Sequence, residues 1–342
     1  MITLIRKLSI YLRRLFHVCF VFCRHFRFAV FLANIISCKI NKKFSVSAGL
    51  AFLQLEPINL CNLSCVLCSA GNGGITRPRG QMDFSFFKKL IDENERTLAF
   101  LVLYHMGEPF LHNDIFRMID YAAKKNIFVK ISSNGFFGHK DIPEKIIRSE
   151  LDELLVSLDF PDAQSYKIMK GKDVFHEVVG NIKALIAARG SRLKPFISLQ
   201  LLMTRNNQDR VKDFFSLSRD LGVDQALIKK IRVDNPDSRN EFLPFDKRYI
   251  RRLYRDGRNS AQNSCLRPQV SATVLWDGNV TACCFDMDGK FVFGNLHDFS
   301  LRKIHSDFLN HRDDISSLCK RCSINDDSGI FIKNKDSLKK VI

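Results

Sequence analysis

The chain has 342 residues, of which 46% are hydrophobic and 26% are charged, and its formal net charge at pH 7 is +17. This is the composition of an ordinary globular protein with room for two or so domains. Its eleven cysteines include CxxxCxxC, CC and CxxC patterns. In a long chain these patterns indicate metal ligation in a reducing, cytoplasmic compartment and argue against the disulfide framework of a small secreted domain. The positive charge permits an anionic partner without requiring one.

Residues 1–43 form a basic segment without carboxylates that is rich in Phe and Leu. Arg13, Arg14, Arg24 and Arg27 interrupt its apolar runs, so none reaches the about 20 residues that a spanning helix needs. We expect either a helix in the interface at the inner face of the membrane or a helix packed on the protein body. A signal peptide is disfavoured because no small-residue cleavage site follows, and an organellar transit peptide ranks third.

A strand-like apolar stretch from Leu53 to Ile58 leads directly into Cys61, Cys65 and Cys68, which have CxxxCxxC spacing. A [4Fe–4S] cluster normally takes four thiolates, so three leave one iron open to a ligand from outside the protein. S-adenosylmethionine (SAM) can chelate that iron through its amine and carboxylate, accept an electron and break a C–S bond to give a carbon radical. The structural alternatives are half of a zinc site, which usually comes as two cysteine pairs, or cysteines that serve as small buried hydrophobes.

From about residue 45 to residue 230, short apolar runs alternate with longer amphipathic runs, which predicts repeated βα units and a parallel sheet. The predicted strands are 52–58, 100–105, 128–132, 153–158, 196–203 and 226–231. The predicted helices are 84–94, 115–125, 143–149, 174–189 and 208–221. Asp83 and Asn113 precede two of these helices and have residue types typical of N-caps.

Polar motifs follow three successive predicted strands. They are Gly107-Glu108-Pro109, Ser132-Ser133-Asn134-Gly135 and Ser157-Leu158-Asp159. In α/β barrels the working residues lie at the carboxyl ends of strands and in the loops that follow. Taken singly, each motif is equally well explained by a turn, a helix start or a cap. Their order after the cysteine motif favours one common site.

Beyond Asp234 the chain becomes charged and loop-rich, which predicts a domain boundary. Asp277-Gly278 between two apolar runs predicts a β-hairpin. Cysteines flank the hairpin and a CxxC follows it, so the predicted ligands are Cys265, Cys283, Cys319 and Cys322. These suffice for one cluster, with Cys284 spare or in place of Cys283, because adjacent strand residues point to opposite sides. A structural zinc ribbon would use the same four cysteines.

The cysteine motif and the three strand-end motifs resemble those of the radical SAM superfamily. The resemblance implies a partial (β/α)6 barrel of parallel strands, a SAM-binding [4Fe–4S] cluster on the three cysteines, and S-adenosyl-L-methionine as cofactor. It implies SAM contacts by Gly107, Glu108, Asn134, Ser157 and Asp159. The chain departs from the family pattern where Met106 replaces the first glycine of a GGEP turn and where Leu67 replaces an aromatic residue.

The C-terminal cysteines resemble a SPASM domain, or the shorter twitch domain, which holds auxiliary [4Fe–4S] clusters. The match includes a turn at Gly294-Asn295-Leu296 and a helix start at Ser300. A full SPASM domain has more cysteines, so one auxiliary [4Fe–4S] cluster is expected. The expected organisation is an N-terminal segment at 1–43, a radical SAM core at 44–234, a small Cys-rich auxiliary-cluster domain at 235–325 and a polar tail at 326–342.

The resemblance implies an enzyme that reductively cleaves SAM and removes a hydrogen atom from its substrate with a 5′-deoxyadenosyl radical. The expected substrate is a small sugar or polyol to be oxidised or epimerised, or a peptide. The N-terminal segment does not look like a peptide-recognition domain, which favours the small molecule. A reductant such as flavodoxin or ferredoxin is expected. An RNA-modifying radical enzyme and a non-catalytic electron-transfer protein are alternatives, although nucleic acid is not an expected partner because no RNA-binding module is evident.

Overall fold

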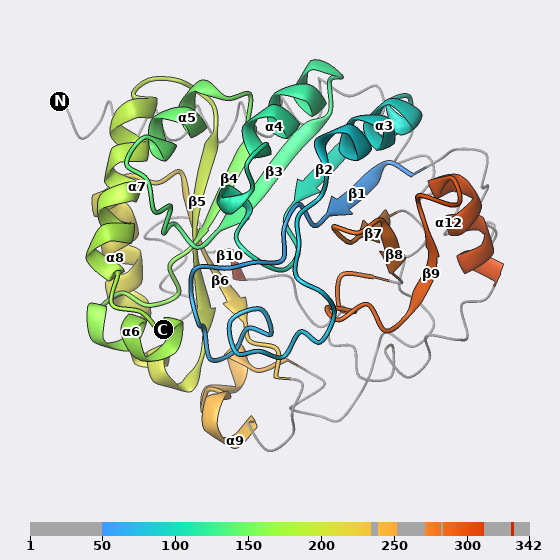
Figure 1. The fold of residues 1–342 in the computed structure, drawn as a ribbon. Coiled ribbons are helices and arrows are strands. Elements are labelled where there is room, and N and C mark those ends of the chain that lie inside the picture. The colour runs from blue at the N-terminus through green and yellow to red at the C-terminus, as the bar shows by residue number, and fades with distance from the viewer. Residues whose placement is uncertain (1–49, 234–238, 252–270, 282, 311–329, 332–342) are drawn as a thin grey trace, which may run out of the picture.

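The computed structural model describes residues 50–233, 239–251, 271–281, 283–310 and 330–331. The predictions for segment 1–43 and for Cys265, Cys319 and Cys322 fall outside the described residues. Within them, the main feature is a ten-stranded sheet in the order β10-β6-β5-β4-β3-β2-β1-β7-β8-β9, flanked by helices (Figure 1).

Six parallel strands follow one another in the sheet in the order in which they occur in the chain. They are β1 Phe52–Leu55, β2 Phe100–Leu103, β3 Phe128–Ser133, β4 Glu153–Ser157, β5 Phe196–Met203 and β6 Gln225–Lys230. The two outer strands of this set do not pair with each other: β1 pairs with β7, and β6 pairs with β10, Ile330–Phe331. The predicted open barrel of six parallel strands is therefore confirmed.

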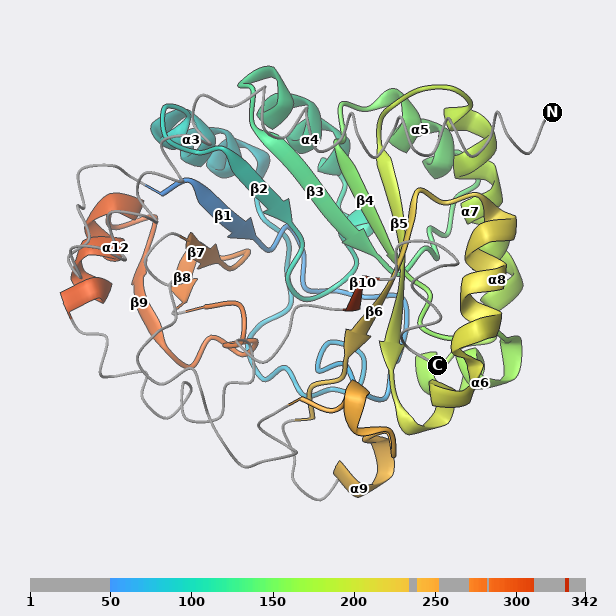
Figure 2. The same cartoon turned by 180° about the vertical axis from the view of Figure 1, so that it is seen from behind.

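Helices connect the strands and lie along the outside of the curved sheet (Figures 1 and 2). The longer ones are α3 Phe84–Asn94, α4 Ile115–Lys124, α5 Ile142–Arg148, α6 Ala163–Lys170, α7 Phe175–Arg189 and α8 Val211–Leu221. The short ones are η2 Pro109–Leu111, η3 Arg205–Arg210, α9 Arg239–Phe242 and η4 Lys247–Tyr249. Among the described residues, no helix has both the length and the apolar character needed to cross a bilayer.

The helix boundaries correct two details of the sequence analysis. Asp83 caps α3 as predicted, because its side chain accepts from the amides of Ser85 and Phe86. The N-cap prediction at Asn113 is wrong: α4 begins after Asp114, whose carboxylate pairs with Arg117 instead of capping the helix. The sequence also fails to predict α6, which is only eight residues long and therefore gives a weak periodic signal.

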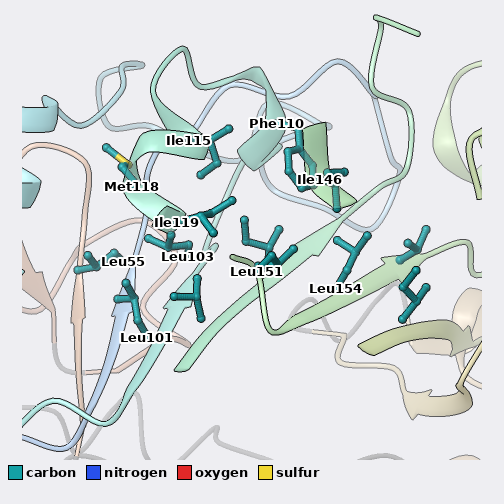
Figure 3. Packing of buried hydrophobic residues seen from close by; sticks show 14 of the residues in the cluster. Leu55, Leu101, Leu103, Phe110, Ile115, Met118, Ile119, Ile146, Leu151 and Leu154 are labelled. Carbon is teal, nitrogen blue, oxygen red and sulfur yellow. The ribbon is translucent and has the colours of Figure 1, made fainter. Parts of the chain in front are cut away.

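The hydrophobic core lies between the strands and the outer helices. Leu55 of β1 and Leu103 of β2 are fully buried and point toward Met118 and Ile119 of α4 (Figure 3). Burying one such side chain contributes about 1.5–3 kcal/mol. Because side chains alternate along a strand, the opposite face of the same strands forms the inner wall of the barrel.

The C-terminal strands continue the same sheet. β7 Ser271–Val274 runs parallel to β1, and β8 Asn279–Thr281 and β9 Val292–Asn295 add antiparallel neighbours. The hairpin predicted at Asp277-Gly278 is confirmed. Gly294 and Asn295 are the last residues of β9, and the predicted turn begins at Asn295, whose carbonyl accepts from the amides of Asp298 and Phe299. The helix α12 Leu301–Asn310 follows where a helix start was expected.

Candidate functional site

Three cysteines lie on the loop that follows β1, beyond the carboxyl end of the parallel strands. Cys61, Cys65 and Cys68 are half-buried. Burial raises the pKa of Cys61 and raises that of Cys65 to about 12, and the charge of Cys68 adds to both shifts. Thiols in this setting stay protonated at neutral pH unless a metal takes the place of the proton. The loop is thus suited to a positively charged metal group.

The donor set fits an iron–sulfur cluster better than a single metal ion. In the described part of the chain, no three His, Cys, Asp or Glu side chains converge closely enough to hold one ion. Cysteines around a cluster bind separate iron atoms instead. Ligation of a cluster by Cys61, Cys65 and Cys68 stays a prediction, as does the zinc half-site that the sequence leaves open.

The end of α6 supports the backbone of the cysteine loop. The amide of Ser64 donates to the carbonyl of Lys170 at 3.2 Å, and the amide of Val66 donates to that of Met169 at 3.0 Å. Gly171 follows with a φ of +71°, and a Cβ there would lie 2.6 Å from the carbonyl oxygen of Ser64. Only glycine fits this conformation and this close approach. The helix that the sequence does not predict therefore holds the cluster loop in place.

Glu108 is buried in the turn after β2, where its carboxylate accepts three hydrogen bonds. One oxygen accepts from Ser133 Oγ at 2.8 Å and from the amide of Phe110 at 3.2 Å, and the other accepts from the amide of Asn134 at 2.7 Å. Burial nevertheless raises the pKa of Glu108 to about 7. A buried carboxylate of this kind gains much from an approaching cation, so it is suited to receive an ammonium group.

Gly107 brings this turn against the cysteine loop. Its φ is +83°, and a Cβ would lie 2.4 Å from the carbonyl oxygen of Ile58 and 2.7 Å from that of Leu60. The amide of Glu108 donates to the same Leu60 carbonyl at 2.8 Å. Met106, the departure from the family pattern, is buried beside this turn. The two motifs are therefore joined through their backbones.

Asn134 joins the turn after β3 to the same loop. Its Nδ2 donates to Oδ1 of Asn62 at 2.9 Å and lies 3.7 Å from Sγ of Cys61. Asn62 in turn donates to the carbonyl of Phe136 at 2.7 Å. The structure thus brings together Gly107, Glu108, Asn134 and the three cysteines, as the sequence predicts. Their contacts to SAM stay predictions.

The motif after β4 encloses a lysine that the sequence analysis misses. Lys170 donates to the carboxylate of Asp159 and, at 3.1 Å, to the carbonyl of Ser157. The other oxygen of Asp159 accepts from the amide of Leu202 at 2.8 Å, and Gln200 donates to Oγ of Ser157 at 3.2 Å. Asp159 therefore already serves an internal ion pair, and SAM contacts by Ser157 and Asp159 stay predictions.

A second missed ion pair connects the cysteine loop to the C-terminal strands. Arg77 donates twice to the fully buried carboxylate of Glu56, and its Nε donates to the carbonyl of Met287 at 3.2 Å. Asp288 accepts from the amide and hydroxyl of Thr76 at 2.7 and 2.6 Å. Met287 and Asp288 are more than two hundred positions from Arg77 and Thr76, so no local motif could have revealed these contacts.

Only part of the auxiliary site lies within the described residues. Cys283 and Cys284 are half-buried after β8, and the amide of Phe285 donates to Sγ of Cys283 at 3.4 Å. Hydrogen bonds of this kind to cysteine sulfurs tune iron–sulfur clusters. The choice between Cys283 and Cys284 stays a prediction, as does the full set with Cys265, Cys319 and Cys322.

Comparison with known proteins defines the class of protein. The family model of the radical SAM superfamily matches residues 55–218, and that of an iron–sulfur cluster-binding domain, SPASM, matches residues 265–323. The chain therefore carries a radical SAM domain followed by a SPASM domain. It is therefore an enzyme whose cofactors are SAM, a SAM-binding iron–sulfur cluster and auxiliary iron–sulfur.

The chain is also similar in sequence to individual proteins with these domains. The chain is 26% identical to mycofactocin maturase MftC of Mycolicibacterium smegmatis over 268 residues, which is 71% of this chain and 67% of the relative. It is 24% identical to the tungsten-containing aldehyde ferredoxin oxidoreductase cofactor-modifying protein of Pyrococcus furiosus over 289 residues, 74% of this chain and 80% of the relative.

Among solved structures, SuiB of Streptococcus suis bound to S-adenosylmethionine has a similar fold. The TM-score is 0.61 at 12% sequence identity, with 85% of this chain and 75% of SuiB covered. SuiB has also been solved bound to the precursor peptide SuiA, with a TM-score of 0.59 at 13% identity. At this identity the likeness concerns the fold alone.

Proposed function

We propose that this enzyme modifies a peptide, by removing a hydrogen atom from one of its residues. The observation that carries the proposal is the 26% identity to a mycofactocin maturase across 71% of the chain, a length that exceeds the radical SAM match alone. The fold shared with SuiB, which binds a precursor peptide, is consistent with it. We therefore favour a peptide substrate over the small sugar or polyol that the sequence alone favours.

The residues of this chain would position the reacting groups. Cys61, Cys65 and Cys68 would hold the cluster, and the buried carboxylate of Glu108 would receive the ammonium of SAM beside it. The amide of Asn134 donates to Glu108 and its side chain lies beside Cys61, so Asn134 would hold the cysteine loop against the carboxyl ends of the strands. When bound, the reduced cluster and SAM supply the hydrogen-atom abstraction, and an auxiliary cluster supplies an acceptor for the electron left on the substrate.

The reducing partner is proposed to be flavodoxin or ferredoxin. Val66 of the cysteine loop is 41% exposed, and Ile168 of the supporting helix α6 is 61% exposed. Large exposed apolar side chains beside the three cysteines offer a small carrier a surface for transient contact. Substituting Ile168→Ser should slow reduction of the cluster by flavodoxin while reduction by dithionite keeps its rate. Equal effects on both reductants would contradict this docking site.

The function is tested with anaerobically reconstituted, dithionite-reduced enzyme and SAM. Formation of 5′-deoxyadenosine is expected, and Cys65→Ala should abolish it while Lys183→Met, an exposed change on α7, should not. Incubation with short peptides encoded beside the gene should give a product whose mass differs by lost hydrogen or a lost fragment. 5′-Deoxyadenosine without any modified peptide would overturn the peptide proposal.

A small cofactor molecule is the second candidate substrate. It is favoured by the 24% identity to the cofactor-modifying protein of Pyrococcus furiosus, which spans 74% of this chain. The two candidates are separated by which added compound raises 5′-deoxyadenosine formation above its background rate. A peptide should do so under our first proposal, and a small metabolite under the second.

A further inference from the structure

The inner wall of the barrel carries a lysine near its mouth. Lys229 stands opposite Leu202 in the pairing of β6 with β5, and its side chain is exposed between the buried residues Ile228 and Lys230. Leu202 shares its strand face with Gln200, whose amide reaches Ser157 on β4. This face is the one turned away from the outer helices, so Lys229 points into the barrel.

Charged groups from other elements act on Lys229. Burial lowers the pKa of Lys229. The charges of Asp159 and Cys284 raise this pKa, whereas those of Arg251 and Lys130 lower it further. These four groups come from different strands and loops on several sides. Lys229 thus stands on the inner face of the sheet with its side chain open to solvent.

The carboxylates near Lys229 already have other partners. Asp159 is paired with Lys170 and accepts from the amide of Leu202. Glu153 of β4 pairs with Lys130 of β3 at 2.6 Å. Among the described residues, the ammonium of Lys229 makes neither an ion pair nor a hydrogen bond. Within the ranges that the structure describes, the inner face of β6 therefore carries a positive charge without a matching negative one.

We infer that Lys229 binds a carboxylate of the substrate at the barrel mouth and so orients the peptide for hydrogen abstraction. This inference rests on the proposed peptide modification. An ammonium without an anionic partner gains from an approaching carboxylate, which would form a charge-assisted hydrogen bond with it. In a peptide, that carboxylate belongs either to an acidic side chain or to the chain terminus.

The test is anaerobic lysine footprinting of the holoenzyme with N-hydroxysuccinimide acetate, mapped by mass spectrometry. Three tripeptide probes are compared: one with a glutamate and an amidated end, one with a glutamine and an amidated end, and one with a glutamine and a free terminal carboxylate. We expect the glutamate probe, the free-acid probe or both to slow acylation of Lys229, and the neutral probe to have no effect. Acylation of Lys183, which is exposed on α7, should not change.

A variant pair extends the test. Lys229→Met should weaken binding of the protecting probe by about tenfold or more, as expected for loss of a charge-assisted contact. Lys183→Met should leave binding unchanged. Which probe protects identifies the source of the carboxylate, and protection by either supports the inference.

Two results would overturn the inference: equal acylation of Lys229 with all three probes, or resistance of Lys229 to acylation without any probe, which would reveal an internal partner.

The footprint needs no turnover. Modified peptide together with a negative footprint therefore rejects only the carboxylate site. A positive footprint with no peptide product from any candidate peptide rejects the proposed function and leaves the site standing.

Discussion

The indole ring of Trp276 fills the space in which a side chain at position 80 would lie. A Cβ on Gly80 would be 2.5 Å from Cη2 of Trp276, and the indole nitrogen donates to the carbonyl of Pro78 at 3.2 Å. Trp276 belongs to the hairpin of β7 and β8, whereas Gly80 follows the cysteine loop. The contact therefore joins the C-terminal strands to the segment that leads away from the cluster ligands.

Replacing this glycine should loosen that junction. Gly80→Ala is expected to lower the free energy of unfolding by about 1–3 kcal/mol because the added methyl collides with a large ring. Urea unfolding of the apoprotein measures the change. Gly180→Ala in α7 is the matched control: its Cβ meets nothing within 4 Å, and it should raise stability by about 0.5–1 kcal/mol. If both variants changed the free energy of unfolding by the same amount, the close packing of Trp276 on Gly80 would be contradicted.

A second pair of glycines separates collision from backbone strain. Gly107 and Gly73 have similar φ values, +83° and +81°, but only at Gly107 would a Cβ meet neighbouring backbone. Gly73→Ala is expected to cost about 1–2 kcal/mol from the left-handed conformation alone. Gly107→Ala should cost clearly more and should also reduce the iron bound on reconstitution. Equal thermal midpoints and equal iron contents for the two variants would show that the close approach at Gly107 is unimportant.

Removing the cation of Lys170 should be strongly destabilising. Lys170→Met leaves the buried carboxylate of Asp159 without its partner, for which the expected loss is about 3–5 kcal/mol. Lys167→Met on the same helix removes an exposed pair with Asp173 and should leave stability unchanged. The double variant Lys170→Met with Asp159→Asn should recover part of the loss in urea unfolding. No recovery would mean that the pair is not the cause.

Glu108 should make the stability of the apoprotein depend on pH. Its pKa is about 7 in the folded protein against 4.5 for an ordinary glutamate, so between these pH values the folded state keeps a proton that the unfolded state has lost. Stability should therefore fall as pH rises through this range, by up to about 1.4 kcal/mol per pH unit. Glu108→Gln should flatten the slope, whereas Glu144→Gln, at an exposed site on α5, should keep it. Denaturation series at several pH values will show whether the two slopes differ.

The basic segment at the start of the chain should act as a membrane contact. The full chain is expected to sediment with vesicles that contain anionic lipid, and salt should release it. A chain that lacks residues 1–43 should stay in the supernatant, as should the full chain with neutral vesicles. Sedimentation that is independent of the segment would favour the alternative, a helix packed on the protein body.

Hydrophobic periodicity was sufficient to locate most of the barrel. The predicted helix 84–94 and the predicted strand 196–203 have the same bounds as α3 and β5. Polar motifs at strand ends also identified residues that do converge, among them Glu108 and Asn134. These features are local, because amphipathic alternation and turn residues are written in a few consecutive positions.

Contacts between segments that are far apart in the chain could not be predicted from the sequence. The parallel pairing of β7 with β1 links residues more than two hundred positions apart, and no pattern within either strand specifies its partner. The hydrogen bond from Arg77 to the carbonyl of Met287 likewise joins residues 210 positions apart. Lys170 lies on a short amphipathic helix, and its role appears only when the fold places Asp159 beside it.

The placement of β7 has a consequence for how this protein can be divided. Both backbone edges of β1 are occupied, one by β2 and the other by β7. A truncated chain that stops before Ser271 would present a bare row of amides and carbonyls just ahead of the metal-binding loop, and such rows recruit strands from other molecules. We therefore expect a chain cut before β7 to aggregate through the exposed edge of β1. The radical SAM domain should be studied together with the C-terminal strands.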